Sequence, residues 1–446
     1  SPKRIQKSTN MVIFFILFEF GSAKIRNFHE MCILNYELFR TFARNLYTEM
    51  KIQTQMLAIA AILLTACHKD KKEEPKQPDT QSVLVYIAGD NNLQDFIMSD
   101  IRQMMEGSKE LTAGNNLLLF VDQKGKLPYL MKVEQSDTLR LMTYTTELKS
   151  SDANTLATAY RWMTENYEAK NYGLILWGHA DGWIIEKARG PRHAYGQDTT
   201  GGEQWMNIPE MAQALSSLPH LRFIFADCCC FQSVESDYEL RNVTDYIIAS
   251  AAEIPGEGAP YHTVIPALFS QRDDFYQLAA NAYYEQVSYG YQEPLSVVKT
   301  SEMENLALAT RTALRQSLEM LDAGKAETYP DVTGLIYYYN QTLFDMQDFV
   351  LHHASEDVYT VWKSVFDRAV VFKTTTTIWM ANFVPYLDAF RDVPQFFRDF
   401  EVTEERYGGV SMFVPQNSAA SNIKKQNDRI SQMQWYKAAG LDELGW

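Results

Sequence analysis

The chain has 446 residues, of which 46% are hydrophobic and 13% aromatic. This is enough apolar material for one large domain or two ordinary ones with a substantial core. The formal net charge of −15 argues against nucleic acid as the main partner, because proteins that bind phosphate backbones present basic surfaces. An acidic surface would suit a cationic substrate, although it is also common among proteins that are merely soluble.

The N-terminal part of the chain is typical of an exported protein. Met50-Lys51 gives a basic start, residues 56–64 form a short apolar run, and small residues precede Cys67. This order is typical of a secretory signal, and the apolar run is too short to span a bilayer. We therefore expect a signal peptide at residues 50–66, with a buried helix and a chance cysteine as the alternative.

The residues on either side of this segment extend the export hypothesis. The four residues that end in Cys67 resemble the bacterial lipobox, whose cysteine becomes a lipidated N-terminus. Residues 67–81 are charged and contain proline, as a tether would. We expect residues 1–49 to be an upstream over-extension without a structured domain, with a real N-terminal anchor as the alternative. The protein would then be lipid-anchored in the bacterial envelope, facing either the periplasm or the outside.

The rest of the chain alternates predicted strands with predicted helices. Apolar runs predict the strands, and apolar residues at helical spacing predict the helices. Their order predicts an α/β fold with a doubly wound, mostly parallel sheet flanked by helices over residues 82–270, followed by a mainly helical part over 271–446 with a late strand that returns to the core. The expected strands are 82–89, 116–121, a hairpin within 127–146, 174–179, 223–226, 245–250 and 407–415, and the expected helices are 93–105, 152–170, 208–217, 234–240, 275–289, 302–323 and 358–372.

Two of the expected strands end in residues that carry chemistry. The run at 174–178 ends at His179, and the run at 223–226 ends at Asp227 and three cysteines. In open α/β sheets the chemistry lies beyond the carboxyl ends of the strands. Neighbouring strands that deliver a histidine and a cysteine to one edge would make a cysteine-nucleophile hydrolase.

Cysteine usage agrees with a local function for the thiols. Apart from Cys32 and Cys67, the cysteines are Cys228, Cys229 and Cys230. Adjacent cysteines rarely build a disulfide framework. Side chains of adjacent residues point in different directions, so only one of the three can face His179. For the other two, buried packing is the expectation.

These motifs resemble the clostripain family of cysteine peptidases, in the caspase-like clan. Their order and spacing carry the resemblance, more than any single motif. The matching stretches are 86–93, 176–183, 227–229, 233–235, 238–240, 246–250, 253–261, 409–415 and 434–436.

The resemblance implies roles for individual residues. The family places its nucleophile two residues after the acid and four before a serine, and both counts give Cys229, with His179 as the base. The reaction would pass through a thioester acyl-enzyme. The oxyanion donors would be the backbone N–H of Cys229 and one beside the histidine. The family's usual glycine at that second position is Ala180 here, with Gly178 on the other side.

The resemblance also implies cleavage after Arg or Lys, which needs a carboxylate in the S1 pocket because a desolvated cation must be paired. Asp227 and Glu257 match the acidic positions of the family. A loop-bracing or helix-capping role is the alternative for Asp227, and a solvated loop charge is the alternative for Glu257.

The loop between the two strand ends suggests self-processing. Family members often mature by cutting themselves there, and a basic, flexible loop would suit an enzyme specific for Arg or Lys. The candidate positions are Lys187, Arg189 and Arg192, with an ordinary surface loop as the alternative.

No cofactor is expected for the chemistry, and the sequence contains no metal-ligand spacing. Some relatives require calcium, and oxygen ligands for a structural Ca²⁺ could come from Asp90, Asn91, Asn92 and Asp198. The expected partners are protein or peptide substrates with Arg or Lys at the cleavage site and, through a lipid anchor, a membrane.

Two other functions stay open at this point. One is a catalytically inactive, peptidase-like surface binding lipoprotein, which Ala180 and the three adjacent cysteines would allow. The other is a thiol redox or metal-binding lipoprotein that uses Cys228 and Cys230, but the chain lacks a Cys-x-x-Cys motif and a second ligand cluster.

Overall fold

The computed structural model describes most of the chain from residue 80 onward. The residues before it, among them the expected signal peptide and Cys67, lie outside the described part except for four helical residues between 40 and 44. The described residues from 80 onward belong to one compact unit, Pro78–Trp446. Among the described helices, none has the length and apolar character that crossing a membrane requires. The described ranges are 80–183, 194–200, 202–286, 294–318, 329–339, 342–374, 379, 400–416 and 421–446.

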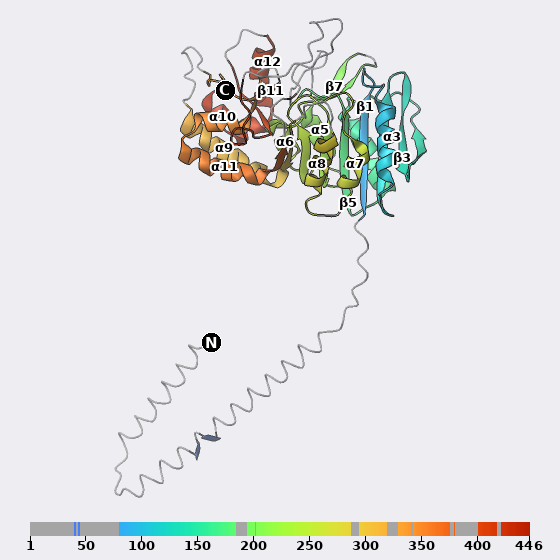
Figure 1. Cartoon of the computed structure of the whole chain (residues 1–446), viewed down its shortest axis with the longest axis horizontal. Helices are drawn as coiled ribbons and strands as arrows, with labels where there is room; N and C mark the ends of the chain where they lie inside the picture. The colour runs from blue at the N-terminus through green and yellow to red at the C-terminus, as the bar shows by residue number, and fades with distance from the viewer. Residues whose placement is uncertain are drawn as a thin grey trace, which may run out of the picture. The chain divides into compact units, whose positions relative to one another are not determined.

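A nine-stranded sheet forms the centre of this unit (Figure 1). Its order is β13-β10-β9-β8-β5-β1-β2-β3-β4, and the five strands from β9 to β2 are parallel. The antiparallel β3 and β4 form the expected hairpin, and β10 and β13 extend the opposite edge. The predicted α/β fold with a mostly parallel sheet is therefore confirmed. The bounds are β1 (Gln81–Gly89), β2 (Asn116–Gln123), β3 (Lys126–Glu134), β4 (Asp137–Thr143), β5 (Asn171–Gly178), β8 (Phe223–Asp227), β9 (Tyr246–Ser250), β10 (Leu295–Lys299) and β13 (Val370–Thr374).

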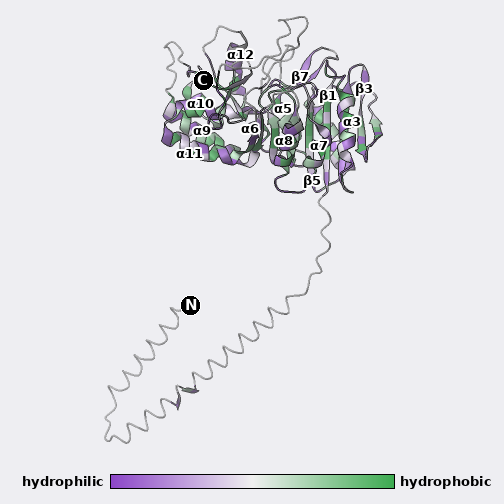
Figure 2. Cartoon of the chain, in the orientation of Figure 1, coloured by the Kyte–Doolittle hydropathy of each residue, from purple (hydrophilic) through white to green (hydrophobic). Residues whose placement is uncertain are grey.

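Helices cover both faces of the sheet, because the central strands are apolar on both sides. In β1, residues 83, 85 and 87 face one buried cluster, and residues 84, 86 and 88 face another. Figure 2 shows β1 largely in the hydrophobic colour. The first cluster includes residues of α3 (Ile97–Ser108), α7 (Tyr261–Leu268) and α8 (Phe275–Gln286), and the second includes residues of α4 (Ala153–Asn166) and α5 (Ile208–Leu215).

A third cluster lies in the C-terminal part of the chain. It joins helices to a three-stranded sheet of order β11-β12-β14. The expected late strand within 407–415 is regular at β14, which pairs with β12 and makes an isolated bridge from Ser411 to Ser233. The remaining elements are β6 (Tyr195–Asp198), β7 (Gln204–Met206), α6 (Val234–Leu240), α9 (Met303–Ser317), β11 (Tyr337–Tyr339), β12 (Leu343–Asp345), α10 (Met346–His353), α11 (Glu356–Ala369), β14 (Ser411–Phe413), α12 (Ser421–Arg429) and α13 (Gln434–Ala438).

Candidate active site

The register of two parallel strands brings His179 and Cys229 to one edge of the sheet. Strands β5 and β8 are neighbours, and Trp177 of β5 pairs with Asp227 of β8. His179 follows Trp177 by two residues, and Cys229 follows Asp227 by two residues. The two side chains therefore start from equivalent levels of adjacent strands, beyond their carboxyl ends.

Gly178, which has a strained backbone conformation, comes directly before His179. Gly178 has φ 148, and a Cβ built on it would lie 2.9 Å from the carbonyl oxygen of Ala88 on β1. Only glycine fits this close approach without strain. His179 then leaves the strand half-buried, with its Nε2 2.6 Å from Oδ1 of Asn92 and its ring centroid 6.3 Å from that of Trp205.

The environment of His179 favours the neutral imidazole. Burial lowers the pKa of His179, and the nearby carboxylate of Glu203 acts in the opposite direction. A neutral imidazole has a lone pair on one ring nitrogen, so at neutral pH the side chain can accept a proton.

Cys229 is half-buried, and its thiol lies against a backbone segment. The N–H of Ile254 is directed at the sulfur, with 3.4 Å between N and Sγ, and the carbonyl oxygen of Ile254 is 3.8 Å from Sγ. Burial raises the pKa of the Cys229 thiol, and the charge of Glu253 raises it further. In this arrangement the thiol is protonated at neutral pH, so it needs a base to react.

The thiol and the imidazole do not hydrogen-bond to each other in this arrangement. Among the described contacts, Sγ of Cys229 meets Ile254, whereas His179 meets Asn92. Catalytic hydrogen bonds often form only once substrate is bound, so the resting geometry is compatible with proton transfer in a complex.

The neighbouring cysteines point into separate buried clusters. Cys228 packs with residues of the sheet, α4 and α5, and Cys230 packs in the C-terminal cluster with Trp183. All three cysteines are free thiols, and only Cys229 keeps some exposure. Cys230 has φ 54, and its N–H donates to the carbonyl oxygen of Ala252 at 2.8 Å. This turn directs the three side chains apart.

Ala180 forms a backbone bridge with Tyr195. The hydrogen bonds of this bridge come from the flanking residues: the N–H of Gly196 donates to His179 at 2.8 Å, and the N–H of Asp181 donates to Ala194 at 3.2 Å. The N–H of Ala180 is not one of the donors in this bridge. The structure thus places this N–H directly beside the histidine.

Asp227 is deeply buried and only partly hydrogen-bonded. Its Oδ2 accepts from the hydroxyl of Tyr261 at 2.6 Å and from the N–H of Ala259 at 3.0 Å, while Oδ1 has no hydrogen-bond partner among the described residues. Burial raises the pKa of Asp227 to about 6. An unpartnered carboxylate oxygen in a dry site favours a cation over a neutral ligand.

A second buried acid, Asp100, lies on the same face of the sheet. Trp177 pairs with Asp227 across the strands, and its indole N–H donates to Oδ2 of Asp100 at 2.7 Å. Burial and the neighbouring Asp227 raise the pKa of Asp100 to about 8. Glu257, by contrast, is exposed on its loop, and it also contributes to the raised pKa of Asp100.

A hollow of about 730 Å³ opens beside the histidine. Its lining is mostly polar and comes from the turn after β1 and from the β6–β7 region. Cys229 is not part of the lining, so the hollow belongs to the histidine side of the site. The lining residues are Asn91, Asn92, Gln94, Asp95, Lys124, His179, Gln197, Thr199 and Trp205.

Of the four calcium ligands expected from the sequence, the two aspartates share a hydrogen-bond donor, whereas the two asparagines have other partners. Asp90 and Asp198 are both buried and both accept from the N–H of Thr200, at 3.1 and 3.0 Å. Asn91 braces the backbone and Asn92 faces His179. Among the described residues, no three His, Cys, Asp or Glu side chains are arranged to hold a metal ion. A structural Ca²⁺ at these residues stays a prediction.

The C-terminal part of the chain braces the segment that follows the nucleophile. The N–H of Ser411 donates to the carbonyl oxygen of Gln232 at 3.1 Å, and the N–H of Phe413 donates to Oε1 of Glu235 at 2.8 Å. Asp345 holds the residues just before β14 in place, because its side chain accepts from the N–H groups of residues 408 and 409.

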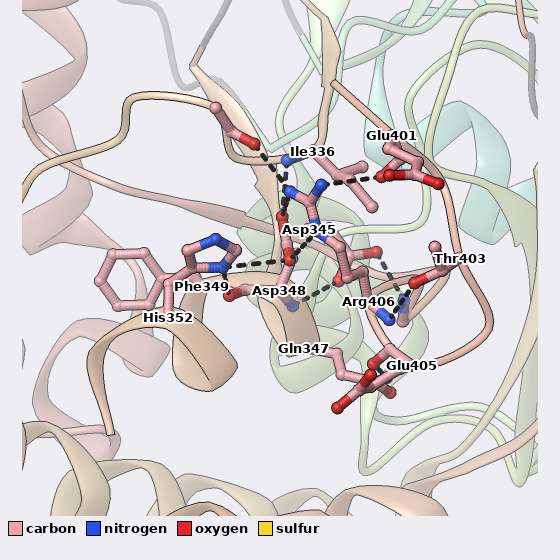
Figure 3. Close-up of polar contacts among 12 residues, drawn as sticks. Ile336, Asp345, Gln347, Asp348, Phe349, His352, Glu401, Thr403, Glu405 and Arg406 are labelled. Atoms are coloured by element: carbon pink, nitrogen blue, oxygen red, sulfur yellow. Dashed lines mark hydrogen bonds and ion pairs between the residues drawn. The ribbon is translucent and has the colours of Figure 1, made fainter. Parts of the chain in front are cut away.

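An ion pair lies beside this anchor (Figure 3). Asp348 is fully buried, and both of its carboxylate oxygens accept from Arg406, at 2.7 and 2.6 Å. Arg406 also donates to the carbonyl oxygens of Glu401 and Gly334.

Several residues of the site were missed in the sequence. Asp100 could have been found, because it lies at helical spacing with the apolar Ile97 and Met104, where a charge is out of place. The sequence indicates Asn92 only as a candidate calcium ligand. Trp205 carried no signal, since the region was expected to be a loop. The expected self-cleavage positions 187, 189 and 192 lie outside the described residues.

Comparison with known proteins decides the family. The model of the clostripain family matches residues 85–442. The chain belongs to the clostripain family. The resemblance inferred from the motifs is thus confirmed, over almost the whole of the unit that the structure describes.

Solved structures of clostripain-family proteins agree in fold. A secreted C11 cysteine protease from Bacteroides thetaiotaomicron, in complex with an irreversible peptide inhibitor, matches with a TM-score of 0.69 and 30% identity, covering 82% of this chain and 99% of that one. An inactive zymogen C11 protease from Parabacteroides distasonis matches with a TM-score of 0.64 and 27% identity, covering 80% and 97%. Clostripain from Hathewaya histolytica is 23% identical over 218 residues, and the match spans only 41% of that relative's length and 41% of this chain.

Proposed function

We propose that the chain is a cysteine endopeptidase that cleaves after Arg or Lys, with Cys229 as nucleophile and His179 as base. The observation that carries the proposal is the register of β5 and β8, which starts both side chains from equivalent levels of adjacent strands. Membership of the clostripain family supports it, as do relatives described as cysteine proteases.

The reaction would proceed in two steps. His179 accepts the thiol proton, and Sγ of Cys229 forms a bond to the carbonyl carbon of the scissile peptide. Backbone N–H groups of Cys229 and Ala180 stabilise the oxyanion. His179 then gives the proton to the leaving amine as the C–N bond breaks, which leaves a thioester. Water, deprotonated by His179, hydrolyses the thioester and restores the thiol.

Asp227 supports the choice of a cationic P1 side chain. Its Oδ1 is buried without a partner, and a guanidinium or ammonium group would supply the missing charge and donor. Asp227 lies two residues before the proposed nucleophile, at the carboxyl end of the same strand, β8. Glu257 is exposed, and in this proposal it helps to attract the cation but does not pair with it in the dry site.

The proposal extends to the parts of the chain that the structure does not describe. Self-cleavage at Lys187, Arg189 or Arg192 would follow from the same specificity. Export, and lipid anchoring through Cys67, would place the enzyme in the bacterial envelope. Relatives described as secreted proteases support export.

The test uses fluorogenic peptides that end in Arg, Lys, Asp or Leu, with the chain in reducing buffer. We expect hydrolysis after Arg and Lys that is lost in Cys229→Ala and in His179→Ala. Cys228→Ala is the matched control, because this neighbouring thiol is buried in a different cluster, and it should keep most of the activity. If no peptide is hydrolysed, with or without calcium and after limited trypsin treatment, the inactive binding lipoprotein becomes the better interpretation.

A further inference from the structure

We propose that Asn92 is a positioning residue for His179: its side-chain oxygen accepts the Nε2–H of the imidazole and so leaves Nδ1 as the nitrogen that takes the proton of Cys229. The inference rests on the proposed function. It deepens that function by adding a third side chain to the expected cysteine–histidine pair.

The first support is the contact itself. Oδ1 of Asn92 lies 2.6 Å from Nε2 of His179, although the two residues are 87 positions apart in the sequence. An amide oxygen can only accept a hydrogen bond, so the proton of a neutral imidazole must be on Nε2. The lone pair is then on Nδ1, and the tautomer of the base is fixed.

The second support is the order of the strands. β5 lies between β8 and β1, and Gly178 of β5 pairs with Ala88 of β1. Cys229 therefore follows one neighbour of β5, and Asn92 follows the other. The two nitrogens of an imidazole are on opposite sides of the ring. With Nε2 bonded to Asn92, this sheet order leaves Nδ1 for the side of Cys229.

The third support is the rigidity of the turn that carries Asn92. The preceding residue, Asn91, donates to the carbonyl oxygens of Ala88 and Gln197, both at 2.9 Å, and accepts from the N–H of Leu93 at 2.9 Å. These bonds join the turn to β1 and to β6. The backbone on each side of Asn92 is fixed, although its own side chain is exposed to the hollow. A fixed acceptor can orient a ring in a way that mobile water cannot.

The fourth support is charge. Burial lowers the pKa of His179, and the carboxylate of Glu203 opposes that effect. The other charged groups in the hollow are Asp95 and Lys124, which have opposite signs. A neutral amide orients the imidazole without stabilising its protonated form. An aspartate at position 92 would also orient the ring, but it would favour the imidazolium and so raise the pKa of His179.

This difference gives a test with two variants and a control, all made in the full chain. Asn92→Ala should lower kcat for Arg peptides by roughly 10- to 100-fold with KM almost unchanged, because an unoriented base loses part of its contribution. Asn92→Asp should restore much of kcat and move the acidic limb of the pH profile to higher pH by about one unit. Asp137→Asn, at an exposed position on the edge strand β4 away from the hollow, removes the same kind of charge as a control and should change neither quantity.

A second readout does not depend on activity. In protein labelled with ¹⁵N-histidine, the nitrogen shifts of His179 report which nitrogen carries the proton, and His179→Gln assigns the signals. We expect the Nε2–H tautomer in the wild type and a mixture in Asn92→Ala. Wild-type kcat in Asn92→Ala, an unmoved pH profile in Asn92→Asp or the Nδ1–H tautomer in the wild type would each overturn the proposal. If the wild type hydrolyses no peptide, the proposed function fails, whereas the tautomer still decides the role of Asn92.

Discussion

At the scale of single residues, the proposed S1 role of Asp227 would link specificity to pH. Its carboxylate can pair with a P1 cation only when it is ionised, and burial raises its pKa to about 6. Below that pH the group is mostly neutral and its attraction for Arg or Lys is lost. The hydrogen bonds from Tyr261 and Ala259 hold the carboxylate in place in both forms.

The corresponding prediction concerns Asp227→Asn. We expect kcat/KM for Arg and Lys peptides to fall by roughly 100-fold or more, because a buried cation would lose its charged partner. In the wild type, kcat/KM should rise between about pH 5 and pH 7 as Asp227 and His179 lose their protons. In Asp227→Asn only His179 still titrates, so this rise should become shallower. Steady-state kinetics on Arg and Leu peptides would measure both effects.

Glu257→Gln is the matched control for this substitution. Because Glu257 is exposed, its replacement should change kcat/KM by only a few-fold, with a stronger effect at low salt. If kcat/KM fell equally in Asp227→Asn and in Glu257→Gln, Asp227 would not be the residue that selects the substrate.

The positions of the candidate site residues were predictable where they follow from the end of a strand. His179, Cys229 and Asp227 come directly after apolar runs, so a strand prediction also locates them at one edge. The contact between Asn92 and His179 requires knowing that β1 lies beside β5, which nothing local in the sequence states. Asp227 was predictable as a site residue, but its partner Tyr261 was not, since the two are 34 residues apart.

At the scale of elements, the strands were easier to predict than the connections between them. The hairpin within 127–146 is confirmed as β3 and β4, because alternating apolar and polar residues identify it locally. β6 and β7 lie within a segment that was expected to be a loop. They are short, and β6 is held in place by contacts with distant residues: Tyr195 bridges Ala180, and the carbonyl oxygen of Gln197 accepts from Asn91.

The small C-terminal sheet depends on a buried ion pair. Asp348 is fully buried, and Arg406 satisfies both of its oxygens while also bonding two carbonyl groups. We expect Arg406→Met to destabilise the protein by about 3–5 kcal/mol, because it removes the cation that bonds both oxygens of a buried carboxylate and leaves His352 and the N–H of Ile336 as its remaining contacts. Thermal unfolding should show a Tm lower by roughly 5 °C or more.

Arg272→Met provides the matched control for this prediction. Arg272 also pairs with an aspartate, Asp274, but both side chains are exposed to solvent. Its replacement should leave Tm almost unchanged. If Arg272→Met lowered Tm as much as Arg406→Met does, burial would not explain the stabilising contribution of the Arg406–Asp348 pair.

At the scale of the whole molecule, buried carboxyl groups make the protein less stable as pH rises, which is an uncommon direction. Among the described residues, burial raises the pKa of several carboxyl groups, and in five of them the pKa reaches about 6 to 8, well above the roughly 4 of an unfolded chain. The folded protein therefore binds more protons than the unfolded chain in this range, and stability is lost as pH rises through the folded pKa values. These groups and their pKa values are Asp100 (about 8), Asp122 (about 7), Glu235 (about 7), Asp198 (about 6) and Asp227 (about 6).

We therefore predict that Tm falls by roughly 5 °C or more between pH 5.5 and pH 8.5. Asp100→Asn should weaken this dependence, since the amide can still accept from Trp177 and does not ionise. The exposed Asp137→Asn serves as the control and should leave the slope as it is in the wild type. A Tm that rises with pH over this range would contradict the assignment of these buried groups.

The fold as a whole was predictable because its sheet is built from apolar runs in regular alternation with helices. The family resemblance came from motifs that all lie at strand ends or in the loops after them. The sequence predicted a late strand that returns to the core, but it did not reveal which residues that strand contacts. The bonds from β14 to Gln232 and Glu235 join residues 178 and 179 positions apart. Such pairings depend on packing of the whole unit.

The most direct test of this account is to find which cysteine a peptide electrophile modifies. A peptide that ends in an arginyl or lysyl acyloxymethyl ketone is added to the wild-type chain, and the adduct is located by mass spectrometry of the digested protein. The account predicts one adduct, on Cys229, which is lost in His179→Ala and strongly reduced in Asp227→Asn. An adduct on Cys228 or Cys230, or none on a folded protein, would contradict it.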